Sequence, residues 1–115
     1  MSSTITLAPR LTAIKSYKKL MKQYYMKAKY GCWFGKKIAW LTSGAPVEFI
    51  YTMGAIPVYP ENHGAICGAS KMATDLCLAA ESVGYSQDLC SYMRSDIGSS
   101  LSGRSPIGGL PRPDF

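Results

Sequence analysis

Apolar side chains between residues 11 and 30 recur at intervals of three and four positions. They stand at 14, 17, 21, 24 and 28, and most of the residues between them are polar, with lysine prominent. This spacing matches the 3.6-residue period of an α-helix, so it predicts one long amphipathic helix that ends near Gly31. Residues 1–10 lack this period and are predicted to be a flexible tail.

Two short apolar runs, 37–42 and 55–59, have the length of buried strands. Between them, Gly44-Ala-Pro46 and the following residues predict a helix over 46–53, since proline suits the first turn of a helix. A strand, a helix and a strand in this order predict a parallel βαβ unit with a right-handed crossover. Pro57 cannot donate to a ladder and therefore favours an edge position for the second strand.

The rest of the chain is predicted to be mainly helical up to residue 102. Residues 60–68 read as a loop, 69–83 as an alanine- and leucine-rich helix, and 91–101 as a third helix that Asp88 or Ser91 caps. The fold class is therefore α/β, with a Rossmann-like or flavodoxin-like βαβ unit after a long helix. The predicted organisation of the chain has three segments: the tail 1–10, a basic helical segment 11–34, and an incomplete α/β part over 35–115.

The net charge of +6 is unevenly distributed. Residues 1–37 carry nine Lys or Arg and no acid, whereas 38–115 carry four basic and seven acidic residues and so have a net charge of −3. A basic segment of this kind can contact nucleic acid, an anionic membrane surface or an acidic protein, or it can be the solvated face of a helix. The last interpretation is favoured, because the aromatic residues fall on the helical stripe. Nucleic acid is not expected as a partner.

The composition is that of a globular chain, with 47% hydrophobic residues. No apolar run reaches the roughly 18 residues of a spanning helix, and the N-terminus lacks the pattern of a secretory signal, so a cytoplasmic protein is expected. The four cysteines (Cys32, Cys67, Cys77 and Cys90) are too far apart in sequence for a zinc knuckle. Any metal site must therefore gather ligands from distant segments or from outside these residues.

Three segments carry a family resemblance: GKKIAWLTSGAPVE over 35–48, PVYPENH over 57–63, and GYSQDLCSYMRSDIG over 84–98. Together they resemble the N-terminal portion of subunits in the benzoyl-CoA reductase and 2-hydroxyacyl-CoA (2-hydroxyglutaryl-CoA) dehydratase family. The resemblance runs from about Gly35 to the last residue. It implies part of an iron–sulfur enzyme that reduces or dehydrates a CoA thioester by ATP-driven transfer of single electrons.

The resemblance also implies the cofactor and the partners. These are a [4Fe–4S] cluster, an acyl-CoA substrate, a homologous partner subunit and a separate ATP-dependent iron–sulfur activator protein. The segments 59–63 and 108–114 favour the benzoyl-CoA reductase type, used in anaerobic degradation of aromatic compounds. The 2-hydroxyacyl-CoA dehydratase is the alternative. Two further alternatives are a non-catalytic α/β binding module and a gene remnant.

The candidate site residues differ in their support. The resemblance implies that Cys90 is one ligand of the [4Fe–4S] cluster, with the other ligands outside this chain, so that the isolated chain should be inactive. Arg94 is a candidate for a CoA phosphate, although an ion pair with Asp96 or Asp88 is slightly favoured. Cys67, four residues after His63, is a second candidate metal ligand. The alternative is that this segment only packs closely. Ser43 and Glu48, where a strand gives way to a helix, are candidates for lining the substrate and cluster site.

Overall fold

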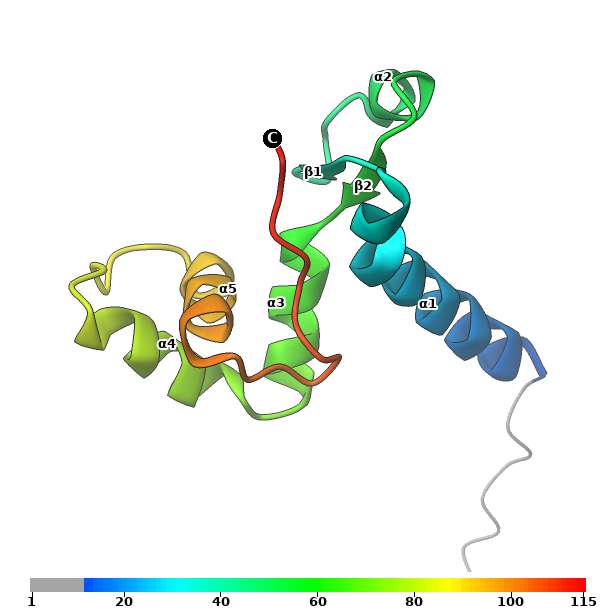
Figure 1. The fold of residues 1–115 in the computed structure, drawn as a ribbon. Coiled ribbons are helices and arrows are strands. Elements are labelled where there is room, and N and C mark those ends of the chain that lie inside the picture. The colour runs from blue at the N-terminus through cyan, green and yellow to red at the C-terminus, as the bar shows by residue number, and fades with distance from the viewer. Residues whose placement is uncertain (1–11) are drawn as a thin grey trace, which may run out of the picture.

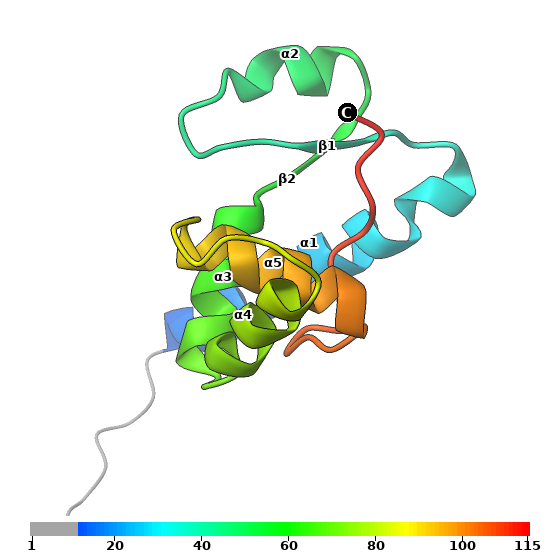
Figure 2. The same cartoon turned by 90° about the vertical axis from the view of Figure 1, so that its left-hand side faces the viewer.

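The computed structural model describes residues 12–115, so the predicted tail lies outside the described residues (Figure 1). The elements in order are α1 (Thr12–Gly31), the 3₁₀ helix η1 (Cys32–Phe34), β1 (Ile38–Trp40), α2 (Val47–Thr52), β2 (Ile56–Val58), α3 (Pro60–Ala69), α4 (Ala73–Ser82) and α5 (Ser91–Ser102). In both views α3, α4 and α5 form a helical group beside the two-stranded sheet (Figures 1 and 2), and Figure 1 shows α1 running away from the sheet.

The predicted parallel βαβ unit is confirmed. β1 and β2 pair in parallel, with Ile38 opposite Ile56 and Trp40 opposite Val58, and α2 connects them. Pro57 lies at the centre of β2, where its carbonyl accepts a hydrogen bond of 2.9 Å from the Tyr24 hydroxyl of α1. β2 has no second strand partner within residues 12–115, which agrees with the edge position that Pro57 predicts.

A small core joins α1 to the sheet. Ala28, Ile38, Ile56 and Val58 are buried together, and Trp40 and Leu110 pack against them. Only the second half of the predicted helical stripe takes part. Ile14 and Tyr17 are exposed, Met21 and Tyr24 are half-buried, and Ala28 is fully buried. The first half of α1 therefore leaves apolar side chains on the surface.

The prediction of a loop over 60–68 is wrong, because α3 occupies Pro60–Ala69. Pro60 provides the first turn and Glu61 lies at its positive end, as helix starts favour. Gly64 and Gly68 suggested a loop, but Gly64 marks a close contact between helices. A Cβ at Gly64 would lie 2.9 Å from the Cβ of Tyr92 on α5.

The second and third predicted helices need smaller corrections. α4 begins at Ala73 instead of 69, because the chain turns through Ser70–Met72, where Lys71 adopts a left-handed backbone with φ of 58°. α5 agrees with the predicted bounds, but neither Asp88 nor Ser91 caps it. Its N-cap residue is Cys90, with no side-chain capping bond.

The last residues of the chain run beside the free edge of β1 (red in Figures 1 and 2). The Trp40 amide donates to the Phe115 carbonyl at 3.0 Å, and the Phe115 amide donates to the Ile38 carbonyl at 3.4 Å. The Asp114 carboxylate accepts from the Ile38 amide at 2.8 Å and from the Lys37 ammonium at 2.9 Å. The Lys37 carbonyl and the Leu41 amide form hydrogen bonds with β2 instead. Residues 114–115 therefore lie on the edge of β1 opposite to β2.

Candidate active site

A cavity of about 490 Å³ opens where β1 ends and where α3 and α5 begin. Two groups of residues line it. The strand wall consists of Trp40, Leu41 and Thr42. The helix wall consists of Pro60 and Glu61 of α3 together with Cys90, Tyr92, Met93, Asp96 and Ile97 at the start of α5. The cavity thus lies at the carboxyl end of a parallel strand, where open α/β sheets bind ligands.

The helical period of α5 explains why these side chains form one wall of the cavity. Positions 92, 93, 96 and 97 are separated by three and four residues, so they share one face of the helix. Cys90 precedes the first turn and brings its thiol to the same cavity. This thiol is exposed and makes no hydrogen bond within residues 12–115, so it is free to bind a ligand.

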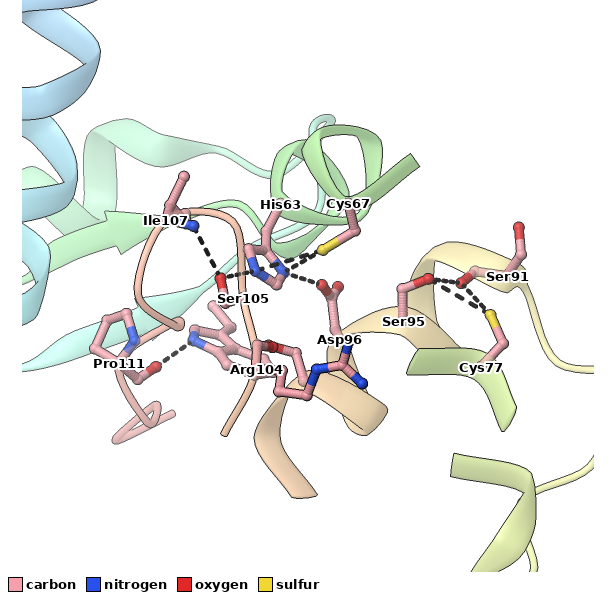
Figure 3. Close-up of polar contacts among 12 residues, drawn as sticks. His63, Cys67, Cys77, Ser91, Ser95, Asp96, Arg104, Ser105, Ile107 and Pro111 are labelled. Carbon is pink, nitrogen blue, oxygen red and sulfur yellow. Dashed lines mark hydrogen bonds and ion pairs between the residues drawn. The ribbon is translucent and has the colours of Figure 1, made fainter. Parts of the chain in front are cut away.

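Behind the helix wall lies a buried polar network formed by Asp96, His63 and Ser105 (Figure 3). His63 Nδ1 is 2.6 Å from Asp96 Oδ1, and His63 Nε2 is 2.8 Å from Ser105 Oγ. The Ile107 amide donates to the same Ser105 oxygen at 3.2 Å. His63 is completely buried, and Asp96 is 6% exposed.

The sequence interpretation missed this network. It considered His63 only with Cys67, and Asp96 only as a partner of Arg94. The signal that could have found Asp96 is the helical spacing from Tyr92 and Met93, which places a carboxylate on the face next to Cys90. Burial raises the pKa of Asp96, and the hydrogen bond from His63 opposes that rise.

Cys67 lies behind His63 and does not line the cavity. It is completely buried, and its sulfur is 3.7 Å from His63 Nε2. Burial raises the pKa of this thiol, and the neighbouring charge of Asp96 adds to the rise. No group of three or more His, Cys, Asp or Glu side chains that could hold a metal ion occurs within residues 12–115. The role of Cys67 as a metal ligand therefore stays a prediction.

Arg94 forms a structural ion pair, as was slightly favoured, but the predicted partners are wrong. Its guanidinium binds the Glu81 carboxylate of α4, and its Nε donates to the Leu89 carbonyl at 3.1 Å. No ion pair or side-chain hydrogen bond joins it to Asp88 or Asp96 within the described residues. This pair ties the start of α5 to the end of α4, and binding of a CoA phosphate by Arg94 stays a prediction.

Ser43 and Glu48 are exposed and lie outside the cavity lining. Ser43 lies in the turn after β1, next to the lining residue Thr42, and Glu48 lies in the first turn of α2. Both are near the carboxyl end of β1 in the chain, but the structure does not bring them together with Cys90. Their predicted lining role is not tested by this geometry.

No helix within residues 12–115 is both long enough and apolar enough to cross a membrane. The surface of α1 is basic, and its lysines are exposed, as expected for the solvated face of a helix.

Comparisons with known proteins agree on one family. Residues 42–115 match the family model described as 2-hydroxyglutaryl-CoA dehydratase, D-component. The chain is 38% identical over 81 residues to the (R)-phenyllactyl-CoA dehydratase alpha subunit of Clostridium sporogenes, covering 70% of this chain and 20% of the relative. It is 36% identical over 96 residues to the (R)-2-hydroxyisocaproyl-CoA dehydratase alpha subunit of Clostridioides difficile, covering 84% and 24%.

A third relative is the lactoyl-CoA dehydratase subunit alpha of Anaerotignum propionicum, 37% identical over 95 residues, with 70% of this chain and 22% of the relative covered. The chain therefore spans about a fifth to a quarter of the curated relatives that it matches. These relatives are dehydratases. They support the dehydratase alternative better than the benzoyl-CoA reductase type that the sequence motifs favoured.

Proposed function

Because the chain belongs to the 2-hydroxyglutaryl-CoA dehydratase D-component family, we propose that it is part of an alpha-type subunit of a 2-hydroxyacyl-CoA dehydratase. In this proposal Cys90 provides one thiolate ligand to a [4Fe–4S] cluster beside the bound thioester. The observation that carries the proposal is the position of Cys90 on the wall of a cavity at the end of β1.

The donor at position 90 fits an iron–sulfur cluster. Thiolate is the usual ligand of such clusters, and the Cys90 thiol is exposed and free of hydrogen bonds within the described residues. Residues 12–115 offer one such thiol at the cavity, so the other ligands would come from outside them. The curated relatives are four to five times longer than the matched part, which leaves room for those ligands.

In the proposed enzyme the cluster would supply a single electron to the thioester carbonyl, after charging by an ATP-dependent activator protein. The residues of this chain would bind and orient the acyl group and keep water away from it. A homologous partner subunit would complete the assembly. The names of the relatives as alpha subunits support this multi-subunit arrangement.

The lining of the cavity favours an apolar acyl group. Trp40, Leu41, Tyr92, Met93 and Ile97 provide most of the walls, and the charged lining residues are two carboxylates, Glu61 and Asp96. No lysine or arginine within residues 12–115 lines it. An acyl chain with its own carboxylate would meet repulsion there, so we infer a substrate with an aliphatic or aromatic side chain.

We also propose that the sheet continues with a third parallel strand on the open edge of β1. The support is the pair of hydrogen bonds between Phe115 and the Ile38 and Trp40 backbone, opposite the edge that β2 uses. The strand order would then reverse at β1, as in flavodoxin-like folds. Ligands bind at such a reversal point, which is where the Cys90 cavity lies.

The test of the proposed function is the replacement Cys90→Ser in the assembled enzyme that contains this chain, purified without oxygen. A hydroxyl is a poor substitute for thiolate at iron. Iron content and visible absorbance should fall, and dehydration of (R)-2-hydroxyisocaproyl-CoA and (R)-phenyllactyl-CoA should be lost.

Cys32→Ser is the matched control, because Cys32 is also exposed but lies at η1, outside the cavity lining. It should retain the iron and the activity. Equal iron content in the wild type and in Cys90→Ser would disprove the ligand assignment.

A further inference from the structure

Asp96 presents one carboxylate oxygen to the buried network and the other to the cavity. Oδ1 bonds His63 Nδ1, whereas no hydrogen bond within residues 12–115 involves Oδ2. No buried side-chain oxygen or nitrogen of the described residues lacks a partner, so Oδ2 must be the atom that reaches solvent. Because Asp96 lines the cavity and is otherwise buried, that solvent is the cavity itself.

The hydrogen bonds orient the network. Ser105 Oγ accepts the Ile107 amide hydrogen and lies 2.8 Å from His63 Nε2, and His63 Nδ1 lies 2.6 Å from Asp96 Oδ1. An ionised carboxylate is an acceptor only, so the second oxygen of Asp96 is a base directed at the acyl-binding cavity.

The surroundings suit a group that takes up and releases a proton. Burial raises the pKa of Asp96, which brings a carboxylate nearer to the working range of a general base. Besides His63, Asp96 is near Tyr25 of α1 and Cys67 of α3, and its charge raises the pKa of both. Glu61 and Cys90 line the same cavity. Tyr25 and Cys67 are both neutral at ordinary pH, so His63 is the polar partner that sets the orientation of Asp96.

We propose, on the basis of the dehydratase function proposed above, that Asp96 is a catalytic base and acid that transfers the C3 proton of the 2-hydroxyacyl group to the departing hydroxide. Removing water breaks the C3–H bond and the C2–O bond. In the proposed enzyme the thioester carbonyl would first hold the added electron. Hydroxide would then leave C2 with the C2–O pair, Asp96 Oδ2 would take the C3 proton, and the C3–H pair would complete the C2=C3 double bond as the added electron returns to its donor. Asp96 then gives its proton to hydroxide, so that water and the original carboxylate result.

His63 and Ser105 act as positioning residues in this proposal. They come from α3 and from the segment after α5, and together they hold the Asp96 carboxylate in one orientation (Figure 3). Neither lines the cavity, so neither contacts the substrate.

The experiment compares Asp96→Asn with Asp75→Asn in the assembled, iron-loaded enzyme. Asparagine has the size of aspartate but cannot accept the proton. Asp75 is an exposed aspartate paired with Arg104 at 3.5 Å, outside the cavity, and serves as the matched control. The probes are (R)-2-hydroxyisocaproyl-CoA and (R)-phenyllactyl-CoA carrying deuterium at C3.

Four measurements are made: the iron content, thioester binding by calorimetry without reductant, the kinetics of water loss (kcat and KM), and the return of hydrogen to C3. Asp96→Asn should retain its iron and its thioester affinity, while kcat and C3 exchange fall by about 10²-fold or more. Asp75→Asn should match the wild type in all four. His63→Gln, which leaves the carboxylate but changes its support, should reduce kcat with little change in KM.

Three results would overturn the proposal. The first is unchanged kcat and exchange in Asp96→Asn. The second is loss of iron or thioester binding in that variant, which would make Asp96 structural. The third is loss of exchange in Glu61→Gln with exchange kept in Asp96→Asn, which would move the base to the other carboxylate of the cavity. A wild-type enzyme that holds no iron and dehydrates none of the probes would instead refute the proposed function itself.

Discussion

The two walls of the Cys90 cavity are held in different ways. The helix wall rests on close helix packing and on the completely buried His63, with Asp96 almost fully buried in front of it. The strand wall has a half-buried Trp40 and Leu41 and an exposed Thr42, and the Lys37–Asp114 ion pair beside it is exposed. Asp96 therefore lies in the more deeply buried part of the site, where local opening should be rarer, whereas Cys90 is exposed.

Gly98→Ala should weaken the helix wall most. Gly98 lies in α5 against α4, and an added Cβ would lie 1.8 Å from the Leu76 carbonyl oxygen, which belongs to the main chain and cannot move aside easily. Such overpacking costs about 3 kcal/mol, and the better helix propensity of alanine returns about 1 kcal/mol. We expect a net loss of about 2 kcal/mol in the free energy of unfolding, measured by urea denaturation.

Gly68→Ala is the matched control for this substitution. Gly68 is also helical, in α3, but a Cβ there meets no atom within 4 Å. That variant should gain up to about 1 kcal/mol from helix propensity. If both variants had the same urea midpoint, the close packing assigned to the helix wall would be incorrect.

Trp40→Phe should weaken the strand wall by less. The Trp40 indole donates to the Pro111 carbonyl at 3.0 Å and packs on the small core of α1 and the sheet. Losing one partly buried hydrogen bond costs about 1 kcal/mol. Trp33, the other tryptophan, is 80% exposed, so Trp33→Phe should stay within about 0.5 kcal/mol of the wild type. A loss in Trp33→Phe equal to that in Trp40→Phe would contradict this account of the strand wall.

The sequence could predict the strand wall better than the helix wall. Short apolar runs separated by turn signals give β1, α2 and β2 directly, because these elements depend on local patterns. The loop predicted over 60–68 fails for a tertiary reason: Gly64 is required by Tyr92 of α5, which is remote in sequence. The Asp96–His63–Ser105 network spans residues 63 to 105, so local spacing can place Asp96 on the cavity face of α5 but cannot bring the three residues together. Cys90 was found by its surrounding motif, and its place on the cavity depends on how α5 packs.

The smallest expected effect concerns Asp114, which ties the last residues to β1. The hydrogen bond from Lys37 lowers the pKa of Asp114, and the Ile38 amide lowers it further. A lowered folded-state pKa means that the carboxylate stabilises the fold above its usual pKa, and that this contribution is lost as pH falls through the folded-state value. Asp114→Asn should therefore cause a small drop in urea midpoint at neutral pH, because the ion pair is largely exposed. The difference from wild type should disappear in acid. A difference that does not shrink as pH falls below about 4, the usual pKa of an aspartate, would show that Asp114 acts through packing instead of charge.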